Sequence, residues 1–132
     1  MLKAYLAIMA IGALGCGMRM WITNGLFVKF GSAFPIGTLV VNILGCFLIG
    51  VFATLTRAEG GFPISPVLRS VVMIGFLGGF TTFSSFALET LTLINHRAWG
   101  HAILNVGLSV LLCLAAVWVG QILALQLASG SE

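Results

Sequence analysis

Four long apolar stretches follow one another along the chain, and the segments between them hold all three prolines and four of the nine charged residues. They predict helices over residues 4–23, 36–56, 67–94 and 100–127. A helix needs about 20 apolar residues to cross the hydrocarbon core of a bilayer, and each stretch reaches that length. The pattern therefore predicts an all-α integral membrane protein whose four transmembrane helices form one domain, residues 1–132.

The third apolar stretch contains a segment rich in glycine, hydroxyl and phenylalanine side chains, with the sequence GFLGGFTTFSSF over residues 75–86. Glycine is unfavourable inside a helix, and serine and threonine compete for backbone hydrogen bonds. We therefore expect a break in this helix around Gly78 and Thr81. Gly78 lies about 16 Å from the start of the helix, near the bilayer midplane. Irregular backbone at this depth needs protein, water or ions to satisfy it, which favours an ion-binding role.

The second stretch carries one amide well inside the membrane. Thr38, Asn42 and Gly45 share a helix face because they are spaced by four and three residues. An amide at this depth is costly unless it bonds a neighbouring helix or lines a wet path. Both interpretations stay open for Asn42 taken alone.

Composition places the chain in the membrane class and argues against several functions. Hydrophobic residues make up 60% and charged residues 7% of the chain, and the mean hydropathy is +1.17, far from the values of soluble domains. The net charge of +3 forms no basic cluster, so we expect no nucleic acid partner. No nucleophile, base and orienting acid are placed together, so we expect no enzyme.

The three cysteines offer no recognised covalent or zinc-binding pattern. Cys16, Cys46 and Cys113 each lie within an apolar stretch, without C-x-x-C spacing or a nearby histidine. Neither a disulfide nor a zinc site is supported by that spacing. We interpret the three side chains as small packing residues.

The positive charges show almost no preference for one side of the membrane. In a four-pass topology, one side holds Lys3, Arg57 and Arg69, and the other holds Lys29 and Arg97, with Arg19 at its border. A chain with so little bias can insert in both orientations. Two opposed copies related by an axis in the membrane plane would bring their breaks face to face, and two carbonyls from each copy would form a four-oxygen cage for a hard cation.

The sequence does not decide the roles of two charged residues that lie inside the apolar stretches. Arg19 is interpreted either as an interface anchor whose guanidinium reaches the headgroups or as a buried group that attracts anions. Glu89, about one turn inside the third helix, is expected at a mouth, paired with Arg97 or another cation.

Two of these segments resemble the signatures of the CrcB/Fluc family of fluoride channels: the GTLxxN pattern of residues 37–42 and the pattern of residues 75–86. Gly15-x-x-x-Arg19 and the pair Asn105-Val106 resemble that family as well, so the resemblance covers essentially the whole chain. It implies an antiparallel, dual-topology homodimer with two pores, which exports fluoride passively from the cytoplasm across the bacterial inner membrane.

The resemblance also implies roles for individual residues. Gly78 and Thr81 would give backbone carbonyls to a structural sodium ion shared by both copies. The predicted pore and fluoride-binding residues are Asn42, Phe83, Phe86, Ser84, Ser85, Thr38 and Ser109. The electropositive edges of the two phenylalanine rings, together with amide and hydroxyl donors, would hold a small anion without a full positive charge.

Two other classes of membrane protein are considered. A small multidrug-type four-helix cation exporter needs a carboxylate deep in its first helix, and residues 4–23 contain none. A non-conducting assembly subunit would use the glycines for packing. Such a subunit would not need a midplane break rich in hydroxyls beside Asn42.

Overall fold

The computed structural model describes residues 1–31, 33–57, 62 and 64–129, and its regular elements over these residues are all helical. In chain order they are α1 (Leu2–Phe30), α2 (Ile36–Leu55), α3 (Pro66–Ser70), the π-helix η1 (Val71–Leu77), α4 (Gly78–Phe80), α5 (Phe83–Asn95) and α6 (Trp99–Ser129). Elements α3 to α5 together form the third of four segments long and apolar enough to cross a membrane.

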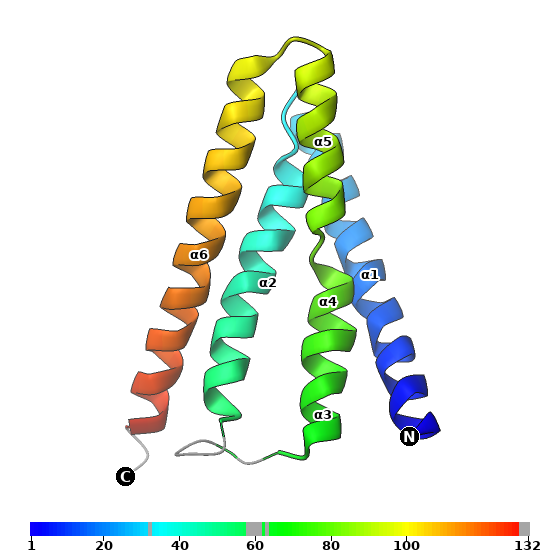
Figure 1. Ribbon diagram of the computed structural model, residues 1–132, viewed down its shortest axis with the longest axis vertical. Coiled ribbons are helices and arrows are strands. Elements are labelled where there is room, and N and C mark those ends of the chain that lie inside the picture. Colours follow the sequence, from blue (N-terminus) through cyan, green and yellow to red (C-terminus); the bar gives the residue numbers. More distant parts are fainter. Residues whose placement is uncertain (32, 58–61, 63, 130–132) are drawn as a thin grey trace.

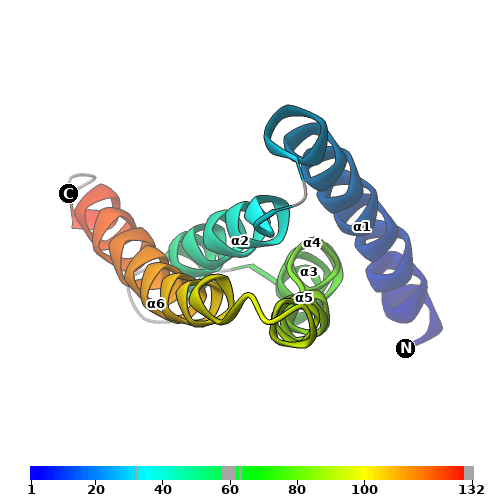
Figure 2. The same cartoon turned by 90° about the horizontal axis from the view of Figure 1, so that it is seen from above.

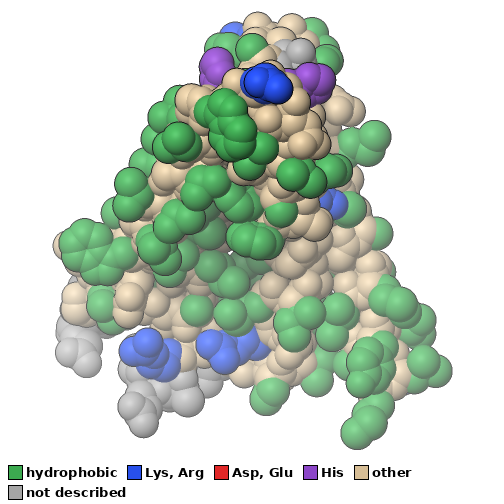
Figure 3. All heavy atoms as spheres, turned by 45° about the horizontal axis from the view of Figure 1, so that its top comes forward, with side chains coloured by type: hydrophobic (Ala, Val, Ile, Leu, Met, Phe, Trp, Pro, Cys, Tyr) green, Lys and Arg blue, Asp and Glu red, His purple; other side chains and the backbone are tan. Residues whose placement is uncertain are grey.

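The four segments lie side by side and fan apart toward one end (Figure 1). They converge near the turn between α5 and α6, and α1 and α6 splay apart at the end that holds the start of α1. Seen from above, α1 and α6 lie on opposite sides of α2 and the third segment (Figure 2). The closest pairs are α2 with α6 and α1 with η1 and α4. On the face shown in Figure 3, hydrophobic side chains cover the middle, and most Lys and Arg side chains lie toward the two ends.

The first helix is longer than the sequence predicts. It was expected over residues 4–23, but α1 continues to Phe30. The apolar pattern resumes over residues 26–28, and one glycine inside a helix costs only about 1 kcal/mol. Gly31 ends the helix, because its φ of 78° belongs to the left-handed region that favours glycine.

Close backbone contacts through glycine hold α1 against the third segment. A Cβ added to Gly15 would collide with the carbonyl oxygen of Phe76, and one added to Gly79 would collide with that of Gly12. Small residues allow this approach, which is the usual way in which helices pack in lipid.

The third segment changes conformation at two threonines. Gly78, where the break was expected to begin, is helical, with φ −66° and ψ −35°. The extended residues are Thr81, with φ −91° and ψ 157°, and Thr82, with φ −153° and ψ 114°. Both are β-branched, which favours extended backbone. Thr82 then caps the next helix, because its Oγ1 accepts from the Ser85 N–H.

Candidate functional site

The extended backbone at Thr82 is held by one side chain from the neighbouring segment. Asn42 Nδ2 donates to the Thr82 carbonyl at 3.0 Å, and the Thr82 N–H donates to Asn42 Oδ1 at 2.8 Å. The Asn42 amide therefore pairs both backbone polar groups of a residue that has left the helix. This pairing removes the cost that an unsatisfied peptide group would carry in an apolar environment.

The same hydrogen bonds change which carbonyls are paired. In a continuous helix, the Thr82 N–H would donate to the Gly78 carbonyl and the Ser85 N–H to the Thr81 carbonyl. Here they donate to Asn42 Oδ1 at 2.8 Å and to Thr82 Oγ1 at 3.1 Å. The carbonyls of Gly78 and Thr81 thus lose their usual helical donors.

Three hydroxyls gather at the start of α5. Thr82 Oγ1 lies 3.1 Å from Ser84 Oγ and donates to Ser85 Oγ at 3.1 Å. Ser84 is exposed and Ser85 is half-buried. The two predicted serines therefore form one hydrogen-bonded cluster with the residue that caps the helix.

A groove of about 370 Å³ lies between α2, α5 and α6. Its walls bring together Asn42, Phe83, Phe86 and Ser109 from the predicted set. The Phe83 side chain is 78% exposed and that of Phe86 is 9% exposed, and their ring centroids lie 5.2 Å apart at an interplanar angle of 49°. The remaining lining residues are Cys46, Thr81, Thr82, Val110, Cys113 and Leu114.

An amide that the predicted set omits links α5 to α6 near this groove. Asn105 is 1% exposed, and its Nδ2 donates to Thr90 Oγ1 at 2.9 Å. The Thr90 hydroxyl in turn donates to the Phe86 carbonyl at 2.7 Å. Asn105 could have been singled out by the argument used for Asn42, because it is also an amide inside an apolar stretch.

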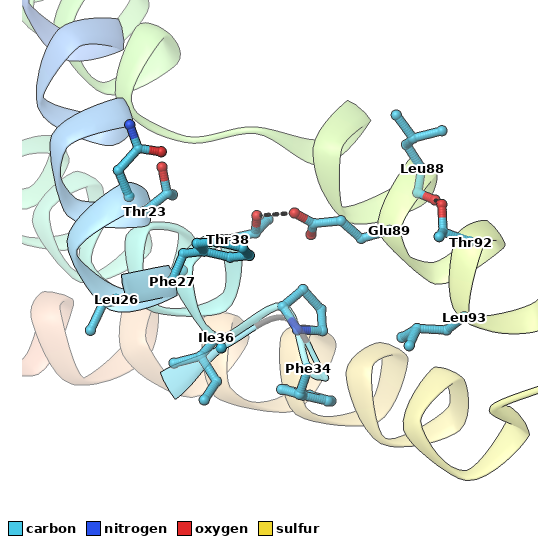
Figure 4. A pocket seen from close by; sticks show the side chains of 14 residues that line it. Thr23, Leu26, Phe27, Phe34, Ile36, Thr38, Leu88, Glu89, Thr92 and Leu93 are labelled. Carbon is cyan, nitrogen blue, oxygen red and sulfur yellow. Dashed lines mark hydrogen bonds between the residues drawn. The ribbon is translucent and has the colours of Figure 1, made fainter. Parts of the chain in front are cut away.

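Thr38 lies apart from the groove, in a second pocket of about 390 Å³ between α1, α2 and α5. Its hydroxyl donates to Glu89 Oε1 at 2.6 Å, and Figure 4 shows the two side chains pointing toward each other. Glu89 Oε2 is buried and has no hydrogen-bond partner among the described residues. Thr38 and Asn42 share a helix face, but Thr38 lines the second pocket and Asn42 lines the groove.

Glu89 and Arg19, the two charged residues whose roles the sequence left undecided, have neighbours that the sequence did not indicate. Glu89 was expected to pair with Arg97 or another cation, but Oε1 accepts from Thr38 and Oε2 has no partner within the described part of the chain. Arg97 lies two helical turns further on, at the exposed turn before α6. Arg19 is half-buried, and its Nη2 donates to Cys16 Sγ at 2.8 Å.

The cysteines differ from the expected packing residues. Cys16 is exposed on α1, whereas Cys46 and Cys113 are half-buried and line the groove. An apolar stretch is sufficient to place a cysteine in the membrane, but in such a stretch the side chain can face lipid, a groove or another helix.

Comparison with known proteins identifies the family that the chain matches. A sequence model of the family described as CrcB-like protein, Camphor Resistance (CrcB), matches residues 6–121. A protein from Opitutus terrae is 49% identical over 128 residues, which cover 97% of each chain. One from Methylocella silvestris is 47% identical, over 93% of this chain and 94% of its own. One from Rhodospirillum rubrum is 45% identical, over 96% and 98%.

These three relatives are named fluoride-specific ion channels. A channel name agrees with the prediction that the chain is not an enzyme. Together with four segments able to cross a membrane, the matches make the chain a multi-pass membrane protein, which in bacteria lies in the inner membrane.

Proposed function

The chain belongs to the CrcB family, and on that premise we propose that it is a passive, fluoride-selective channel that lets the ion leave the cytoplasm. The observation that carries this proposal is the groove that is lined together by Asn42, Phe83, Phe86 and Ser109. The names of the relatives supply the identity of the ion.

The lining of the groove suits a small anion that must pass rather than stay. One Nδ2 hydrogen of Asn42 is used by Thr82, which leaves the second for an anion, because a side-chain amide has two donors. Ring edges of the two phenylalanines add weak positive potential. None of the described residues that line the groove is charged. Weak, repeated sites permit both entry and exit, whereas a buried cation would trap the ion.

The conducting unit is an antiparallel homodimer with two pores. One chain leaves the groove open beside Phe83, whose side chain is 78% exposed, and a second copy would close it. A two-fold axis in the membrane plane would bring Gly78 of both copies together. Gly78 is exposed in the single chain, which leaves room for that contact.

A sodium ion at the dimer centre is part of the proposal. The carbonyls of Gly78 and Thr81 would hold it, and they fit the task because their helical donors are engaged by Asn42 and Thr82 instead. Hard cations prefer oxygen ligands of this kind. When bound, the ion would supply a positive charge that offsets the repulsion between the four carbonyl oxygens. In the chain itself, Asn42 and Thr82 keep these carbonyls free of helical bonds.

Fluoride efflux from proteoliposomes tests the function. Vesicles loaded with potassium fluoride and containing the purified chain should release fluoride rapidly when valinomycin removes the opposing membrane potential, as read by a fluoride electrode. Vesicles loaded with potassium chloride should release much less chloride under the same conditions. Efflux no faster than from empty vesicles, or equal release of chloride, would contradict the proposal.

A further inference from the structure

Helices α2 and α6 run in the same direction (Figure 1), and their backbones approach closely at two glycines. A Cβ added to Gly50 would collide with the Val117 carbonyl oxygen, and one added to Gly120 would collide with that of Phe47. These two contacts fix the register of the pair. Because the helices are parallel, side chains one turn earlier on each helix also face one another.

That register sets Cys46 opposite Cys113. Each cysteine lies four residues before a contact residue, Cys46 before Gly50 and Cys113 before Val117. Both side chains line the same groove. Two thiols that face one groove from matching turns of two closely packed helices form a preorganised pair rather than two separate packing residues.

We propose that Cys46 and Cys113 form a two-thiol site for one soft, divalent metal ion that accepts linear coordination, with the mercuric ion as its probe. Thiolate sulfur selects soft metals over hard ones. Each thiol releases one proton as its sulfur bonds the metal, so that a divalent ion with two thiolates is neutral.

Neutrality decides which ions the site takes. A monovalent ion held by two thiolates would leave one negative charge in a groove without charged lining residues, and an uncompensated charge is costly in an apolar environment. A hard divalent ion such as magnesium would lack the oxygen ligands it needs. The site therefore favours a soft divalent ion.

An ion bound here would stand in the wall of the groove beside Asn42, Phe83 and Phe86. On the proposed function, it would lower fluoride efflux by occupying the path. That consequence depends on conduction, but binding itself does not.

The binding test uses Cys16→Ser as the background, because Cys16 is exposed on α1 and lies outside the groove. With mercuric chloride, this variant should retain one metal ion per chain and lose both free thiols, counted after unfolding in SDS. Adding Cys46→Ser or Cys113→Ser should let a monothiol competitor remove the metal at a concentration about 100-fold lower or less, since the second bond is intramolecular.

Two results would overturn the site: one thiol lost per metal ion in Cys16→Ser, or single-thiol variants that hold the metal as firmly as the pair. The thiol count needs neither groove cysteine to be replaced, so it decides the question even where a double variant fails to fold.

The efflux arm separates this site from the proposed function. Mercuric chloride should slow fluoride efflux through Cys16→Ser at least tenfold, and a dithiol chelator should restore it, whereas each single-thiol variant should keep most of its own metal-free rate. Efflux absent without metal would contradict the proposed function and leave the thiol count valid. If efflux is normal without metal and bound metal does not slow it, the proposal that the metal blocks the path is contradicted.

Discussion

Asn42 couples the second membrane segment to the third through a single side-chain amide. Of the two interpretations that the sequence left open, hydrogen bonding to a neighbouring segment is observed, and the residue also lines the groove. Sequence reasoning found the residue because an amide is costly at that depth. It did not find the partner, because nothing in the local pattern of α2 indicates that Thr82 is the residue whose backbone needs pairing.

Asn42→Leu should therefore destabilise the fold as well as the channel. The backbone N–H and the carbonyl of Thr82 would both lose their partners. Each group left unpaired lowers the free energy of unfolding by about 1–3 kcal/mol. We expect a clearly lower thermal unfolding midpoint in detergent. Asn95→Leu, at the exposed end of α5, is the matched control and should change the midpoint little. Equal midpoints for the two variants would show that the amide does not hold the break.

Phe83→Ile should separate conduction from stability. Phe83 is 78% exposed in the single chain, so removing its ring creates no cavity within the subunit. The substitution also removes an aromatic ring from the groove proposed as the anion path. We expect fluoride efflux to fall at least tenfold while the unfolding midpoint stays close to that of the parent.

Phe86→Ile should reduce efflux too, but the buried ring should also cost stability. Phe30→Ile, on the exposed end of α1, controls for the loss of an aromatic ring. Efflux that is unchanged in both groove variants would rule out the ring-edge mechanism.

The helices and the bends within them follow from different kinds of information. Hydropathy predicts the four crossings, because each must be apolar over its length whatever it packs against. The end of α1 was misplaced because Asn24 and Gly25 resemble a turn, although the apolar pattern continues beyond them. The π-helix Val71–Leu77 has no comparable signature in the local sequence. It packs closely against α1, where a Cβ added to Gly75 would collide with the Ile8 carbonyl oxygen.

Glycines should respond to alanine substitution according to their contacts. Gly50→Ala should lower the unfolding midpoint, because the new Cβ would collide with the backbone of Val117, which cannot move aside easily. Gly25→Ala is the matched variant, because Gly25 lies inside α1 and no described atom beyond its own helix lies within 4 Å of the added Cβ. Alanine there should stabilise the helix by about 1 kcal/mol. Shifts of the same sign in both variants would contradict the contact-based account.

The arrangement of the chain in the membrane is the feature that could be predicted least well from the sequence alone. Pattern and charge predicted four crossings and balanced ends, and on the face shown in Figure 3 most Lys and Arg side chains lie toward those ends. The pairing of two copies depends on surfaces that no local pattern encodes. It remains part of the proposed function.

Charge substitutions should test the two orientations directly. Lys29→Gln with Arg97→Gln removes positive charge from one end, and Lys3→Gln with Arg57→Gln removes it from the other. Each pair should bias insertion toward one orientation, since positive residues favour the cytoplasmic side.

Each double variant expressed alone should therefore lose most of its fluoride efflux, and co-expression of the two should restore it. Full activity of either variant alone would contradict the antiparallel dimer. The expression level of each variant, measured in the same membranes, controls for failure to insert.

The extended pair Thr81–Thr82 also divides one crossing into two helices whose dipoles meet inside the membrane. The segment before the pair ends at α4 with its negative pole, at the carbonyls proposed for sodium, and α5 begins at Phe83 with its positive pole. One interruption therefore presents opposite potentials within a few residues. A cation and an anion can each be stabilised there by the backbone itself, so the channel needs no charged side chain at its centre.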